Sequence, residues 1–103
     1  MNPTSINVVK MFNHLNKKHF GGRLPYCDMR WSNRMTKTCG SIISEDRFIK
    51  LSVKYHEKHE VTELKDTILH EMIHLYLHEN GNKSFRIHGK EFKKMAKKVG
   101  VNV

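Results

Sequence analysis

The stretch at residues 62–79 constrains the fold more than any other, because its apolar residues cover more than half of a helical circumference. The apolar residues at helical spacing are Val61, Leu64, Ile68, Leu69, Met72, Ile73, Leu75, Tyr76 and Leu77. Thr62 suits an N-cap, and Asn80 and Gly81 suit the end of the helix. A helix this apolar packs at the centre of a domain. We therefore predict a central helix over residues 62–79.

The remaining sector of this helix is polar, and two of its residues are spaced for a shared ligand. Imidazoles four residues apart lie one helical turn from each other, so His70 and His74 can reach the same cation. Neutral imidazole nitrogen suits Zn²⁺, which prefers a tetrahedral set of ligands. Glu71 lies beside the pair but off their line, where its carboxylate can take a proton from water. This HExxH pattern predicts a zinc hydrolase with one zinc per chain and Glu71 as its catalytic base.

A catalytic zinc also needs a third protein ligand and one open position, and the sequence offers three candidates. His78 continues the ladder, but it starts ~12 Å from His70 along a straight helix at ~1.5 Å per residue. Glu91 lies 17 residues after His74, a distance at which zinc proteases with a glutamate ligand often supply it. His88 lies 14 residues after His74, at the start of a predicted last helix. Spacing alone leaves these alternatives open.

Segments outside the central helix predict an α+β fold. The predicted elements, in order, are a helix at 5–20, strands at 26–31, 39–44 and 47–53, the central helix, and a helix at 88–99. In the first helix Ile6, Val9, Phe12 and Leu15 form the expected apolar stripe. The polar residues Glu45 and Asp46 predict a turn that makes the last two strands an antiparallel hairpin.

Composition limits the partners and the cell compartment. Lys and Arg number 19 against 10 Asp and Glu, a formal charge of +9, which favours a polyanion such as nucleic acid. No run approaches the ~20 apolar residues that cross a bilayer, and the first residues lack a signal-peptide pattern. We expect a cytoplasmic monomer, or one in the nucleoid or nucleus if it associates with DNA. Cys27 and Cys39 lack metal-binding spacing, and we expect buried or half-buried free thiols.

Cationic residues recur at near-helical spacing around the predicted last helix, on the side away from its apolar residues. They are Arg86, Lys90, Lys93, Lys94, Lys97 and Lys98. One interpretation is a solvated lysine face. The other is a surface that contacts the DNA backbone without reading its sequence. No aromatic residue interleaves with these cations, so base stacking is not expected.

Five blocks of sequence, in this order, resemble the SprT-like (Spartan) family of metalloprotease domains. The blocks are 20–25 (FGGRLP), 31–36 (WSNRMT), 39–40 (CG), 69–75 (LHEMIHL) and 88–92 (HGKEF). HExxH alone occurs in many unrelated proteins, whereas the ordered set runs over nearly the whole chain and is much more specific.

The resemblance implies a compact gluzincin-like fold, with a small three-stranded antiparallel sheet packed on helices and an extended substrate along an edge strand. It implies three histidine ligands, His70, His74 and His88, and leaves Glu91 outside the ligand set. It also implies a zinc endopeptidase that cleaves proteins trapped on DNA, an activity in DNA repair. Many members carry a four-cysteine zinc ribbon after this domain, which these residues lack. We expect residues 1–103 to form one SprT-like metalloprotease domain.

A competing hypothesis is a nucleic-acid-binding module with a structural zinc and no hydrolytic activity. It predicts a closed site in which His78 or a cysteine supplies a fourth ligand. A third hypothesis is a regulatory domain whose protease activity is silent without a partner. For an enzyme, the candidate groups to stabilise an oxyanion are Arg86, Tyr55 and His78.

Overall fold

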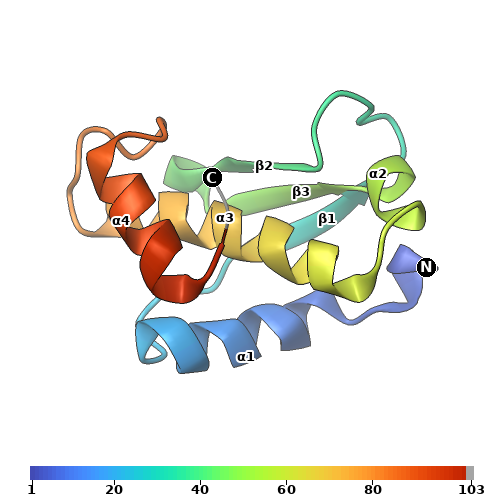
Figure 1. Ribbon diagram of the computed structural model, residues 1–103, viewed down its shortest axis with the longest axis horizontal. Coiled ribbons are helices and arrows are strands. Elements are labelled where there is room, and N and C mark those ends of the chain that lie inside the picture. The colour runs from blue at the N-terminus through green and yellow to red at the C-terminus, as the bar shows by residue number, and fades with distance from the viewer. Residues whose placement is uncertain (102–103) are drawn as a thin grey trace.

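The most buried of the three strands lies at the centre of the sheet. In the computed structural model, which describes residues 1–101, β3 (Phe48–Ser52) lies between β1 (Asp28–Ser32) and β2 (Gly40–Ile43). Ile49 and Leu51 of β3 have no exposed surface. Because β3 occupies the centre, β2 is an edge strand, and it lies alongside the central helix α3 (Val61–Glu79) (Figure 1).

The prediction of an all-antiparallel sheet is wrong, because the sheet is mixed. β2 and β3 form the predicted antiparallel hairpin, but β1 pairs with β3 in parallel. Residues 33–39 carry the chain past the position of β3 to the far edge, and β3 then folds back between the two earlier strands. The side chain of Ser52 donates to the carbonyl of Met35, and its N–H donates to the carbonyl of Cys39, which holds this connection against the end of β3.

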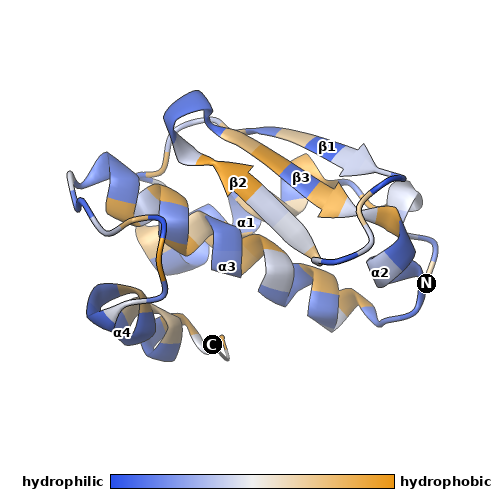
Figure 2. Ribbon diagram, turned by 90° about the horizontal axis from the view of Figure 1, so that it is seen from above, coloured by the Kyte–Doolittle hydropathy of each residue, from blue (hydrophilic) through white to orange (hydrophobic). Residues whose placement is uncertain are grey.

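The predicted central helix is confirmed as α3, with a different start. The helix begins at Val61 after Glu60, which gives no side-chain cap, so Thr62 is not the N-cap. Its end at Asn80 agrees with the prediction. The fully buried side chains along it are Leu64, Ile68, Met72, Ile73 and Leu75. Apolar and polar bands alternate along α3 when the molecule is seen from above (Figure 2).

The N-terminal helix α1 (Val8–Phe20) is shorter than predicted. The short 3-10 helix η1 (Pro3–Ser5) precedes it, and the side chain of Asn7 caps α1 by accepting from the N–H of Lys10. The core side of α1 contains Val8, Phe12 and Leu15, whereas Val9, which the apolar stripe placed inward, is 40% exposed.

Two further helices complete the chain. The helix α2 (Val53–Glu57) was not predicted; the side chain of Ser52 caps it, and it takes up residues where apolar spacing resembled a strand. The last helix α4 (Lys90–Val99) begins two residues later than predicted, and it buries Phe92, Ala96 and Val99. Seen from above, β2 is the strand nearest α4 (Figure 2).

The distance between β2 and α3 depends on a glycine. A Cβ atom at Gly40 would lie 2.8 Å from Cγ2 of Thr67 and 3.2 Å from the carbonyl oxygen of Lys50. Glycine therefore lets the edge strand approach the helix that carries HExxH. Among residues 1–101, no helix combines the length and the apolar character that crossing a membrane requires.

Candidate metal centre

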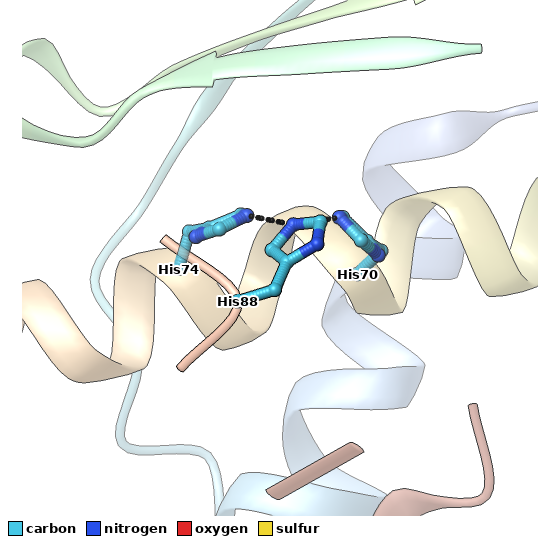
Figure 3. A group of neighbouring side chains, drawn as sticks. All are labelled: His70, His74 and His88. Carbon is cyan, nitrogen blue, oxygen red and sulfur yellow. Dashed lines mark hydrogen bonds between the residues drawn. The ribbon is translucent and has the colours of Figure 1, made fainter. Parts of the chain in front are cut away.

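Three imidazoles converge at one point above α3. Nε2 of His88 lies 2.9 Å from Nε2 of His70 and 3.2 Å from Nε2 of His74 (Figure 3). His70 and His74 lie one turn apart on α3, and His88 arrives from the segment that joins α3 to α4. Within residues 1–101, these three residues form the group whose ligand atoms lie close enough to hold a metal ion, and neither His78 nor Glu91 belongs to it.

The donor set suits a zinc-sized ion. Two nitrogens that each lie ~2.05 Å from one ion at a tetrahedral angle are about 3.3 Å apart, close to the two separations between the imidazoles. Nδ1 of His74 donates to the carbonyl of Phe85 at 2.6 Å, which leaves the lone pair of Nε2 directed at the centre. The residues present therefore fit a metal with a preference for imidazole nitrogen.

Burial keeps two of these imidazoles neutral. Burial, together with the neighbouring His88 and His74, lowers the pKa of His70 to about 4. Burial also lowers the pKa of His74. A neutral ring carries the lone pair that a metal needs, so no proton competes with metal binding near pH 7.

Glu71 lies beside the three histidines but outside their cluster. The residue is 5% exposed, and burial raises its pKa to about 7 in the metal-free protein. It faces the same cavity as the histidines, a cleft of about 1000 Å³ between β2, α3 and the segment that carries Phe85, Arg86 and His88. A buried carboxylate whose pKa lies near neutrality is suited to accepting a proton.

Comparison with known proteins places this centre in a family. A sequence model of the SprT-like family matches residues 8–103. The chain belongs to the SprT-like family. The resemblance in the five sequence blocks is thereby confirmed.

Several characterised relatives of this SprT-like chain carry names that state an activity. The DNA-dependent metalloprotease SPRTN of Rattus norvegicus is 37% identical over 87 residues, which are 80% of this chain and 18% of that protein. The Homo sapiens protein of the same name is 36% identical over the same shares. The DNA-dependent metalloprotease dvc-1 of Caenorhabditis elegans is 33% identical over 84% of this chain and 26% of its own length. The chain thus spans about a quarter or less of these relatives.

His78 and Glu91, the two other candidate ligands, both lie outside the cluster of three histidines. His78 contacts the carboxylate of Glu79 at 3.2 Å and packs its ring edge-on against Phe85, with centroids 4.7 Å apart. Glu79 also pairs with Arg47 at 2.9 Å, and these two contacts hold its pKa low despite burial, which alone would raise it. His78 therefore supports the residue whose carbonyl orients His74. Glu91 is exposed at the first turn of α4.

The sequence did not predict that an aromatic ring packs against the three histidines. The ring of Phe92 stacks on His88 with centroids 4.4 Å apart, and it also contacts His70 at 4.9 Å and His74 at 4.6 Å. Phe92 is 1% exposed, so its ring both fills the core and supports all three imidazoles. Its position four residues after His88 was the available signal, since residues at that spacing share a helix face.

The cationic residues around α4 divide into two groups. Arg86 lines the cleft, pairs with Glu45 across it, and lies over the ring of Phe85 at 5.0 Å. The lysines of α4 are Lys90, Lys93, Lys94, Lys97 and Lys98. All five are exposed and form no ion pair within residues 1–101. Of the six cationic residues around α4, these five lysines therefore form an exposed cationic face, and Arg86 does not belong to it.

Proposed function

We propose that this chain is a zinc-dependent endopeptidase, with His70, His74 and His88 as ligands to one zinc and Glu71 as the general base. The observation that carries the proposal is the convergence of three imidazole nitrogens beside a buried carboxylate in a wide cleft. The relatives named as metalloproteases support the same activity. Residues 1–103 would form one gluzincin-like protease domain.

Different parts of the chain would have different roles in peptide hydrolysis. When bound, zinc would supply a Lewis acid for the scissile carbonyl and lower the pKa of water. Glu71 would accept a proton from the attacking water and pass it to the leaving amine. The free edge of β2 would pair with an extended peptide through backbone hydrogen bonds. This edge borders the cleft, so the peptide would lie over Glu71.

Of the three candidate groups for oxyanion stabilisation, two lie at the cleft. Tyr55 and Arg86 line the cleft, whereas His78 does not. The hydroxyl of Tyr55 donates to Glu63 at 2.8 Å, and this bond raises the pKa of Tyr55 to about 12. A protonated hydroxyl is a hydrogen-bond donor at every physiological pH. Either Tyr55 or Arg86 would have to leave its present carboxylate partner to reach the substrate.

The number of ligands favours an enzyme over a nucleic-acid-binding module with a structural zinc. A structural site is closed by four protein ligands, and a catalytic site keeps one position open. Among residues 1–101, the cluster contains three candidate ligands, and neither cysteine joins it. Both cysteines are free thiols, as expected: Cys27 is buried, and Cys39 is half-buried and borders the cleft.

We further propose that the substrates are proteins associated with DNA or crosslinked to it, in the nucleus or nucleoid. The names of the relatives include dependence on DNA. The formal charge of +9 and the exposed lysines of α4 support contact with a polyanion. Such contact would be independent of DNA sequence and would weaken as the salt concentration rises.

Replacing Glu71 by Gln tests the mechanism, because glutamine keeps the size of the side chain but cannot accept the proton. The Glu71→Gln variant should bind one zinc per chain and unfold at the temperature of the wild type. Its hydrolysis of an unfolded protein, with DNA present, should fall by at least about 100-fold, in line with loss of a general base. Activity equal to that of the wild type would refute the assignment of Glu71.

A further inference from the structure

A second cationic surface lies on α1, away from the metal centre. Lys10, His14, Lys17 and Lys18 are spaced at i, i+4, i+7 and i+8, so they share one side of the helix. All four are exposed, opposite the buried residues of the helix. We call these four residues the α1 stripe.

No nearby carboxylate neutralises the α1 stripe. Residues 1–27 contain no Asp or Glu, and none of the four residues forms an ion pair within residues 1–101. The pKa of His19, the residue that follows Lys18, responds to the charges around it. Burial lowers its pKa first, and the positive charges of Lys18 and Lys65 lower it further. The charged groups that lower the pKa of His19 are therefore all cationic, and they lie on α1 and at Lys65 of α3.

The α1 stripe is remote from the cleft. Figure 1 shows α1 on one side of α3 and β2 on the other. None of the four residues lines the cleft, whose walls come from β2, α3 and the segment before α4. A polyanion bound along α1 would therefore leave β2 and the three histidines open to a peptide.

We propose that the α1 stripe is a docking surface for the phosphate backbone of nucleic acid, separate from the lysines of α4. The stripe runs ~12 Å at ~1.5 Å per residue. That length matches about three phosphates of one strand, at ~3.4 Å of axis each. The choice of DNA as the natural polyanion rests on the proposed function, whereas the surface itself rests on charge and position.

The chemistry of α1 favours nucleic acid over an anionic membrane. A helix that binds a membrane surface needs a free apolar side to insert. The apolar side of α1 is occupied, since Val8, Phe12 and Leu15 belong to the core. The α1 stripe also contains no Phe, Tyr or Trp as a platform for base stacking, so we expect contacts to the backbone.

Neutralising the α1 stripe tests this proposal. The variant Lys10→Gln/Lys17→Gln/Lys18→Gln removes three charges and keeps helix-forming side chains. The matched control Lys50→Gln/Lys54→Gln/Lys58→Gln removes the same charge from exposed lysines elsewhere. A third variant, Lys93→Gln/Lys94→Gln/Lys97→Gln, neutralises α4. Fluorescence anisotropy with a short DNA duplex, between about 50 and 200 mM salt, gives Kd and its salt dependence for each protein.

The α1 variant should bind the duplex at least about tenfold more weakly at the lowest salt. Its slope of log K against log salt should be shallower by about 2.7, or ~0.9 for each of three lost phosphate contacts. The control should stay within about twofold of the wild type. Hydrolysis of a short peptide without DNA should be the same in all proteins, because none of these lysines lines the cleft.

Three results would overturn the proposal. If only the α4 variant loses affinity, DNA association stands, but the α1 stripe is a solvated face. If the wild type binds phosphatidylserine vesicles and not DNA, the partner class is wrong. If the wild type binds no nucleic acid at any salt concentration, both this proposal and the proposed DNA association fail. In that case the short-peptide assay still decides the proposed peptidase activity by itself.

Discussion

His88 is the residue on which the candidate metal centre most depends, since it reaches the cluster from outside α3 and is exposed. Its ring is held by stacking on Phe92, and its Nε2 approaches both other imidazoles. Spacing in the sequence could not separate His88 from Glu91, because both lie near the start of α4. The fold separates them by directing His88 toward α3 while Glu91 is exposed.

Alanine substitutions at these two positions should have unequal effects on metal binding. The His88→Ala variant should lose zinc affinity by at least about 100-fold, because two imidazoles alone make an incomplete site. The Glu91→Ala variant should bind zinc as the wild type does. Competition with a chromophoric chelator measures both affinities. Zinc loss in Glu91→Ala with zinc retained in His88→Ala would show that the ligand assignment is wrong.

His56 couples stability to pH at a site away from the metal centre. Its ring is fully buried, neither ring nitrogen has a hydrogen-bond partner among residues 1–101, and burial lowers its pKa below the ordinary 6.5. The unfolded chain therefore takes up the proton first as pH falls through 6.5. The free energy of unfolding should decrease from there down to the lowered folded pKa.

The variant His56→Phe should weaken this dependence on pH. Phenylalanine fills a similar volume and does not titrate, so the difference between the two proteins isolates the proton on His56. One proton contributes at most about 1.4 kcal/mol per pH unit to the slope. Urea unfolding of the metal-free proteins between about pH 7.5 and 5 measures it. Parallel curves for the two proteins would contradict a neutral buried His56.

At the scale of elements, the contact between β2 and α3 sets one wall of the cleft. Its closeness depends on Gly40, where an added Cβ would lie 2.8 Å from Cγ2 of Thr67. The hydroxyl of Thr67 also donates to the carbonyl of Glu63, and this bond fixes the orientation of the Thr67 side chain. Neither the strand nor the helix can move freely to admit a methyl group.

The substitution Gly40→Ala should destabilise the fold by about 1–3 kcal/mol, the usual cost of overpacking. Adding Thr67→Ser removes Cγ2 but keeps the hydroxyl, so the double variant should recover part of the loss. The tight approach to the carbonyl of Lys50 would remain. Urea unfolding of the single and double variants gives the comparison. No recovery in the double variant would show that Thr67 is not the limiting contact.

Some of the elements were predictable from the local sequence pattern, and others were not. The helix α3 was predictable because its apolar periodicity and its polar sector are local properties of the chain. The parallel pairing of β1 with β3 was not, because it depends on the route of residues 33–39, which local pattern does not encode. The short helix α2 was missed because Val53 continues the apolar spacing of β3.

In the candidate site, too, only some residues were predictable from the local sequence pattern. His70, Glu71 and His74 follow from spacing on one helix. His88 entered through family resemblance, and its approach to the other two requires the fold. Arg86 was grouped with the α4 lysines by helical spacing, yet it lies before α4 and pairs with Glu45 across the cleft. Partners that come from distant parts of the chain, such as Glu45 and Phe85, could not be read from local pattern.

At the scale of the whole molecule, eight of the 19 Lys and Arg residues lie on two separate helices, α1 and α4. The cleft lies between β2 and α3, and in it the cationic Arg86 pairs with Glu45. This separation would let a polyanion and a peptide bind at the same time, as the proposed activity on DNA-associated proteins requires.

Zinc coordination in the wild-type protein tests the central claim most directly. X-ray absorption at the zinc edge should show three imidazole nitrogens near 2.0–2.1 Å and one further light atom from solvent, with no sulfur. Elemental analysis should give about one zinc per chain. Four protein ligands, a sulfur at ~2.3 Å, or a protein that takes up no zinc would contradict a catalytic centre formed by His70, His74 and His88.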